Sequence, residues 1–166
     1  MAGKRKTPAG LGVRRDRTVQ EHVHDTFKLK RKLPEPTACP ECRAVYHKGR
    51  WTWAKVPPQA HKAVCPACRR TRDRIPAGMV TLKGSFLSEH KAEVLGLARN
   101  AEKRESQQHA LSRIMNVEAK GDTLLINTTD THLARRIGDA LYDAYEGTLS
   151  VRYAKGQERV RVSWVR

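Results

Sequence analysis

Residues 85–166 alternate between two hydrophobic periods, one typical of helices and the other of strands. Apolar residues recur every three or four positions over 89–107 and over 131–146, which predicts two amphipathic helices. Alternating or continuous apolar runs predict four strands, over 111–119, 124–126, 148–154 and 159–165. The predicted order is α-β-β-α-β-β, and two helices on one face of a four-stranded sheet can enclose a single core.

Polar residues and a glycine mark the ends of these helices. Ser88 precedes the first helix, and Thr128, Thr129 and Asp130 precede the second. Side chains of these types accept the free N–H groups at a helix start. Gly147 follows the second helix, where glycine commonly ends a helix. We therefore expect the two helices to begin and end close to these positions.

Residues 34–84 contain only short strand patterns. Aromatic and basic residues alternate between Tyr46 and Lys55, which predicts a strand with one packed face. Another short strand is predicted over Met79–Leu82. If this strand joins the later sheet, the order begins β-α-β-β-α-β, which is a ferredoxin-like plan.

The first 33 residues are expected to form little stable structure. Residues 1–17 combine Gly, Pro and clustered charge with few large apolar side chains, so we expect them to be disordered when free. Residues 18–32 predict a short helix with a strongly basic end. The prolines within residues 33–36 then end any helix and predict a linker.

All four cysteines of the chain lie in two matched Cys-Pro-x-Cys turns, separated by 22 residues. Each turn can direct two thiolates at one point, and two turns complete a tetrahedral shell suited to Zn²⁺. An iron centre and redox dithiols are the alternatives. A closed four-sulfur shell is typical of a structural rather than a catalytic metal. The predicted ligands are Cys39, Cys42, Cys65 and Cys68.

These segments predict an α+β protein with three parts. Residues 1–33 would form a basic, largely disordered arm, and residues 34–84 a zinc-ribbon module. Residues 85–166 would form a small two-layer α/β domain. His47 and His61 lie near the cysteines, but four thiolates already fill the metal shell.

The chain is strongly basic, with a net charge of +16 and a pI of about 10.2. Residues 1–33 and residues 34–84 each hold ten Lys and Arg against three acids, whereas residues 85–166 hold thirteen against eleven. Such a surplus indicates a polyanionic partner, with nucleic acid favoured over an anionic membrane. No apolar run approaches the roughly 18 residues of a membrane span, and pairing of all thiols for a metal favours the cytoplasm.

The candidate nucleic-acid contacts surround the cysteines. The module of residues 34–84 has three acids for ten cations, so most of its guanidinium groups would have no carboxylate partner. Each of these groups could bind a phosphate through two N–H groups at once. Trp51 and Trp53 can either stack on unpaired bases or form the small core. The predicted basic contacts are Arg43, Lys48, Arg50, Arg69, Arg70, Arg72 and Arg74.

A second candidate site lies at the start of the predicted helix over 131–146. Hydroxyl and N–H groups there can hold a phosphate, and His132, Arg135 and Arg136 can reinforce it. Ordinary helix capping explains the Thr and Asp residues equally well. The chain has no Gly-rich phosphate loop and no nucleophile elbow, so we expect no enzymatic activity.

The two cysteine turns, together with residues 46–51, 68–73, 76–78 and 129–138, resemble a family of small bacterial proteins. The zinc portion is similar to the amino-terminal region of the archaeal and eukaryotic adaptor that exports large ribosomal subunits, although the adaptor has more cysteine turns. The adaptor family binds the intersubunit face of the large subunit. The resemblance therefore implies binding to ribosomal RNA.

The sequence thus predicts a zinc-stabilised ribosome-associated factor that binds rRNA of the large subunit in assembly, hibernation or rescue. A zinc-ribbon DNA-binding transcription regulator is one alternative. An RNA-processing enzyme with a cleft around His132 or His109 is a second, and an adaptor that captures a protein without the ribosome is a third.

Overall fold

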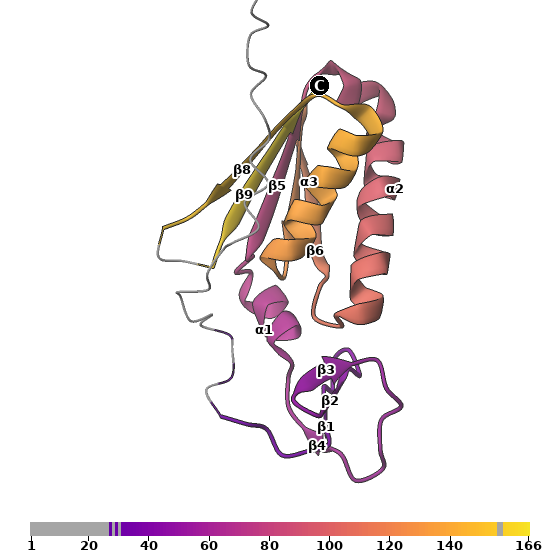
Figure 1. The fold of residues 1–166 in the computed structure, drawn as a ribbon, viewed down its shortest axis with the longest axis vertical. Helices are drawn as coiled ribbons and strands as arrows, with labels where there is room; N and C mark the ends of the chain where they lie inside the picture. The colour runs from indigo at the N-terminus through magenta and orange to yellow at the C-terminus, as the bar shows by residue number, and fades with distance from the viewer. Residues whose placement is uncertain (1–26, 28, 30, 156–157) are drawn as a thin grey trace, which may run out of the picture.

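The computed structural model describes residues 27, 29, 31–155 and 158–166, which form two β-sheets and three helices (Figure 1). The mixed α+β class predicted from the sequence is confirmed. Residues 1–17, and most of the helix predicted over 18–32, lie outside the described residues.

The first sheet is small and has the strand order β3-β2-β1-β4. Its strands are β1 (Thr37–Ala38), β2 (Val45–His47), β3 (Arg50–Thr52) and β4 (His61–Lys62). The single strand predicted between Tyr46 and Lys55 is wrong, because Lys48 and Gly49 adopt positive φ angles of 49° and 78° and reverse the chain between β2 and β3. The Glu35 carboxylate accepts the N–H groups of both turn residues, at 2.7 and 3.2 Å, and holds the turn.

Helix α1 (Pro66–Asp73) begins inside the second cysteine turn, where the sequence predicted only a turn. Cys65 is the N-cap and its sulfur accepts the N–H of Cys68 at 3.4 Å, while Pro66 occupies the first turn. Proline suits that position because its missing N–H would have no partner within the helix. The helix ends at Arg74, which has a left-handed φ of 54°.

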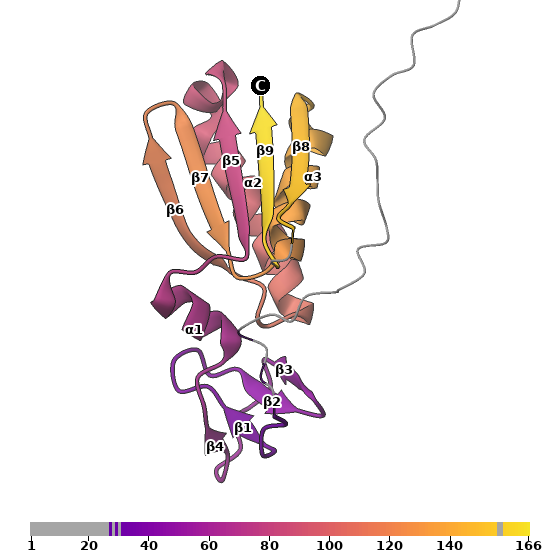
Figure 2. The ribbon, with the colours of Figure 1, turned by 90° about the vertical axis from the view of Figure 1, so that its left-hand side faces the viewer.

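The second sheet has five strands in the order β6-β7-β5-β9-β8, and helices α2 and α3 cover one of its faces (Figures 1 and 2). The elements follow the predicted order with one strand added in front. They are β5 (Gly78–Lys83), α2 (Ser85–Gln108), β6 (Ile114–Lys120), β7 (Thr123–Thr128), α3 (Thr131–Tyr145), β8 (Thr148–Tyr153) and β9 (Val160–Val165).

Strand β5, predicted over Met79–Leu82, lies at the centre of this sheet and pairs with β7 and β9. The ferredoxin-like plan closes with one strand after the second helix, whereas here β8 and β9 both follow α3. The last strand, β9, lies beside β5 and parallel to it. Hydrophobicity agrees with this order, because Val160, Val162 and Trp164 of β9 are completely buried or nearly so, whereas the inward residues of the edge strand β8, Leu149 and Val151, are only partly buried.

The predicted helix ends are close to the observed ones. Helix α3 begins after Asp130, whose carboxylate accepts the N–H of Leu133 at 2.7 Å. Helix α2 begins at Ser85 instead of following a cap at Ser88, and the Ser88 hydroxyl donates to the Ser85 carbonyl at 2.6 Å. A kink at His90 separates this extra turn from the regular part of α2, which agrees with the predicted range.

Candidate metal centre and basic surfaces

The four cysteine sulfurs converge on one point, within 4.8 Å of one another. Cys39 and Cys42 lie in the turn after β1, whereas Cys65 and Cys68 lie at the start of α1. Cys42 Sγ and Cys65 Sγ are 3.7 Å apart. Three of the four residues are buried, and Cys42 is partly exposed. The predicted ligands therefore form a cluster that can hold one metal ion.

Backbone N–H groups point at these sulfurs. The N–H of Cys65 donates to Cys39 Sγ, and the N–H of Cys68 donates to Cys65 Sγ, both at 3.4 Å. Burial acts to raise the pKa of Cys39, but N–H groups of Cys65, Cys42 and Glu41 outweigh it and lower the pKa to about 7. Burial and neighbouring sulfurs raise the pKa of Cys65 and Cys68. A bound cation would relieve this crowding, since it stabilises all four thiolates.

A guanidinium group from the second half of the chain also contacts the sulfurs. Arg113 lies between α2 and β6, and its Nη2 is 3.2 Å from Cys65 Sγ and 3.6 Å from Cys42 Sγ. Its Nη1 is 3.6 Å from Cys68 Sγ. Burial acts to lower the pKa of Arg113, but the three sulfurs outweigh it and raise the pKa. This contact could not be predicted from the sequence, because Arg113 lies 45 positions after Cys68.

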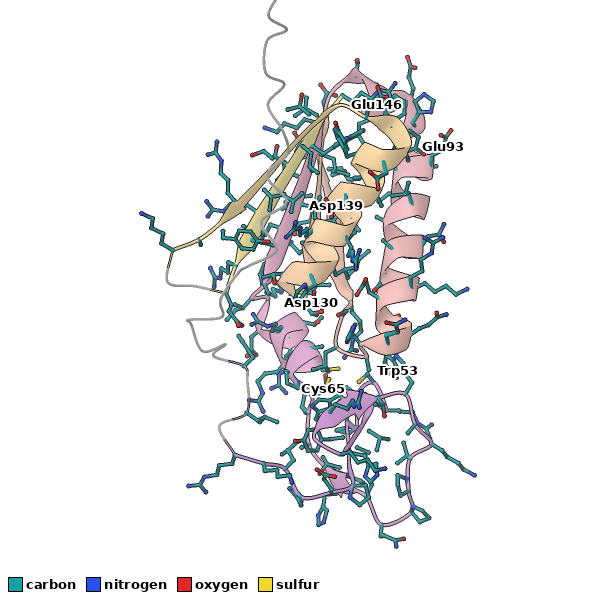
Figure 3. The ribbon with its side chains drawn as sticks, viewed as in Figure 1. Trp53, Cys65, Glu93, Asp130, Asp139 and Glu146 are labelled. Carbon is teal, nitrogen blue, oxygen red and sulfur yellow. The ribbon has the colours of Figure 1, made fainter. Side chains whose placement is uncertain are left out.

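The cysteine cluster lies where the first sheet meets the end of α2, as Figure 3 shows for Cys65 and Trp53. The indole N–H of Trp53 donates to the Ser106 carbonyl at 2.7 Å, and its ring lies 5.7 Å from the Arg113 guanidinium. Ala110 packs in the same buried cluster as three of the cysteines and Trp51, and Leu111 packs against that cluster.

Two of the predicted RNA contacts are buried within the molecule. Arg70 is only 5% exposed; its guanidinium donates to the Ile75 carbonyl at 3.3 Å and lies 4.4 Å from the Phe27 ring centre. Trp51 is 7% exposed and packs against Tyr46. Trp51 is therefore part of the core, whereas Trp53 keeps 47% of its surface exposed.

Three further predicted contacts belong to ion pairs at the surface, whose members are exposed or partly exposed. Arg72 lies 3.8 Å from Glu41 and 3.7 Å from Asp73. On α3, Arg135 lies 3.9 Å from Asp139 and Arg136 lies 3.2 Å from Glu105. Exposed pairs of this kind contribute little stability, so these arginines can exchange partners at low cost.

The remaining predicted cations are more accessible. Arg69 is partly exposed, and four others are exposed and form no ion pair within the described part of the chain. These four are Arg43, Lys48, Arg50 and Arg74.

The helix start near residue 130 is an ordinary cap. Asp130 caps α3, and the Thr128 hydroxyl donates to the Asp130 carbonyl at 2.7 Å. The Thr129 hydroxyl donates to Leu111 and accepts the N–H of Arg113. These groups are satisfied within the protein, which favours the capping interpretation over a phosphate site.

Sequence reasoning missed a basic surface on the β8–β9 hairpin. Four exposed cations lie on it, Arg152 directly opposite Arg161 in register, and none forms an ion pair within the described residues. We call Arg152, Lys155, Arg159 and Arg161 the hairpin surface. Six of the eleven acids of residues 85–166 lie on α2 and α3, so a charge averaged over the whole segment concealed this surplus.

The hairpin surface lies toward the end of the sheet that faces α1. Val160 pairs with Gly78, and its N–H donates to the Ala77 carbonyl, three residues after Arg74. Figure 2 shows α1 and the start of β9 at this same end of the sheet. Tyr153, 44% exposed, adds an aromatic ring to the hairpin.

No family model, curated protein or solved structure matches the chain. Among the described residues, every helix is too short or too polar to cross a membrane.

Proposed function

We propose that this protein is a zinc-stabilised RNA-binding factor that acts on the ribosome, with rRNA of the large subunit as its target. The observation that supports the proposal best is the four-sulfur cluster, at which α1 begins, with Arg72 and Arg74 exposed at the other end of the helix. A cytoplasmic location suits this function and the four free thiols.

Zinc is the metal that best suits the cluster. Tetrahedral Zn²⁺ with Zn–S bonds of about 2.3 Å places its sulfurs about 3.8 Å apart. The 3.7 Å separation of Cys42 and Cys65 is close to this value. Four thiolates also favour zinc over magnesium and calcium, which prefer oxygen ligands. The closed shell leaves no position for a substrate, so the metal would stabilise the fold without catalysing a reaction.

The proposed RNA interface consists of exposed cations that form no ion pair with the residues that the structure describes. Arg43, Lys48, Arg50 and Arg74 are of this kind among the described residues, and the hairpin surface adds four more. Phosphate contacts from such side chains supply affinity through release of counterions from the RNA. Trp53 and Tyr153 are exposed rings that can stack on unpaired bases.

The ribosomal target rests on the resemblance of the cysteine turns and neighbouring residues to the large-subunit export adaptor. Assembly, hibernation and rescue are all compatible with an rRNA-binding protein of this kind. No catalytic step is proposed.

Two measurements test this function. In sucrose gradients of a cell lysate, the tagged protein should sediment with the large subunit or the whole ribosome at low salt and leave it at high salt. With purified components, the logarithm of rRNA affinity should fall linearly with the logarithm of salt concentration, by about 0.7–0.9 per phosphate contact. Sedimentation only at the top of the gradient would exclude the ribosomal target, and tighter binding to duplex DNA at equal salt would favour a transcription regulator.

A further inference from the structure

The metal cluster receives its hydrogen-bond donors from both halves of the chain. The N–H groups come from the cysteine turns themselves, but the guanidinium comes from the loop between α2 and β6. We propose that Arg113 is a positioning residue of the metal site, which binds the thiolates from the α/β half and thereby raises the affinity for zinc. This inference rests on the zinc part of the proposed function and is independent of RNA binding.

Charge is the first argument. Four thiolates around Zn²⁺ carry two net negative charges, and a buried anion needs a nearby cation or hydrogen-bond donors. The arginines that follow the cysteines in the sequence make no hydrogen bond to the sulfurs among the described residues. Arg70 points to Ile75 and Phe27, and Arg43 is exposed. Among the described residues, Arg113 is the one cation with hydrogen bonds to the sulfurs.

Geometry is the second argument. One guanidinium group contacts three sulfurs at distances of 3.2–3.6 Å. The guanidinium is planar and carries several N–H groups, so it can bind three sulfurs better than the compact ammonium group of a lysine can. Because each N–H···S bond withdraws charge from sulfur, Arg113 would tune the metal as well as orient its ligands.

The main chain of Arg113 is fixed independently of the metal. Its N–H donates to the Thr129 hydroxyl at 2.8 Å, and its carbonyl accepts the N–H of Thr129 at 2.9 Å. The next residue, Ile114, donates to the Glu102 carboxylate at 2.7 Å. The α/β half therefore holds the backbone of Arg113 beside the sulfurs before the metal binds, which reduces the entropy lost when the guanidinium contacts them.

The test compares R113M and R113K with the wild type, using the full chain loaded with Zn²⁺ or Co²⁺. R99M is the matched control, because Arg99 is an exposed arginine of α2 with no ion pair within the described residues. Competition with a chelator should show zinc affinity on the order of 10–100-fold weaker in R113M, since residues that support metal ligands have effects of this size. R113K should fall between R113M and the wild type, and R99M should match the wild type.

The cobalt spectrum separates a direct effect on sulfur from a general loss of stability. Removal of the N–H···S bonds raises the energy of the sulfur electrons, so the sulfur-to-cobalt charge-transfer bands of R113M should move to longer wavelength. Wild-type affinity and unshifted bands in R113M would overturn the inference. If R113M does not fold, R113K decides in the same way, because wild-type affinity and band positions in R113K would also overturn it. Failure of the wild type to bind zinc would instead refute the proposed metal.

Discussion

At the scale of single residues, four cysteines that lie in two distant turns of the sequence meet in one cluster that can hold a metal ion, with Arg113 against their sulfurs. The spacing of the cysteines carries the whole pattern of a four-sulfur site, so local sequence was sufficient for Cys39, Cys42, Cys65 and Cys68. The partner Arg113 is brought in by tertiary packing, for which neither spacing nor composition gives a signal. The burial of Arg70 was missed for the same reason, because a density of charge does not show which guanidinium faces inward.

Two helical glycines give a matched test of packing at this scale. A Cβ atom at Gly138 of α3 would lie 2.6 Å from Val162 Cγ1 and 3.0 Å from Leu149 Cδ1, whereas one at Gly96 of α2 would meet nothing within 4 Å. We expect Gly138→Ala to destabilise the protein by about 1–3 kcal/mol, the usual cost of overpacking a core. Gly96→Ala should instead stabilise it by roughly 0.5–1 kcal/mol, because alanine is the better helix former. Urea unfolding of both variants measures the difference, and stabilisation by Gly138→Ala would show that α3 does not pack tightly on β8 and β9.

At the scale of elements, periodicity predicted the helices and strands of the second half well. Strongly periodic segments such as 131–146 have one solution that buries the apolar face, so their existence and type follow from the sequence. The short elements could not be predicted from the sequence in this way. Helix α1 was missed because its eight residues are mainly polar and its start lies inside the cysteine turn, where the N-cap is a cysteine.

The hairpin surface gives a test at the element scale. The double variant R159Q/R161Q, which removes two positive charges, should bind rRNA more weakly and reduce the slope of log affinity against log salt by about 0.7–0.9 for each lost phosphate contact. The control R99Q/K103Q removes the same charge from exposed positions of α2. Equal effects of the two double variants would show that only net charge matters and that the hairpin is not a contact surface.

At the scale of the whole molecule, the sequence predicted the fold class but not the strand order. The strand order depends on which strands have a neighbour at both edges, and only the packed structure shows that β9 lies between β5 and β8. The two sheets also differ in the interactions that stabilise them. The second sheet encloses a large core that includes Trp164, Leu82 and Ile126, whereas the first relies on very short strands and the cysteine cluster.

Metal removal should therefore affect the two sheets differently. Zinc binding contributes on the order of 10–16 kcal/mol in small sites, which exceeds what the first sheet can obtain from its own core. With a strong chelator, amide hydrogen exchange should become fast over β1 to β4 and α1 and remain slow in β7 and β9. Retained protection of β2, β3 and α1 in metal-free protein would contradict a stabilising role for the metal.

The contact of Trp53 with the end of α2 makes the junction of the two halves observable without a label. Its indole N–H binds the Ser106 carbonyl while the ring stays half in solvent, and the other two tryptophans, Trp51 and Trp164, are buried. If the junction opened, Trp53 would exchange a protein carbonyl for water, and its fluorescence would shift to the red while the emission of Trp164 stayed unchanged. The fluorescence of Trp53 therefore reports whether the cysteine cluster stays in contact with the α/β half.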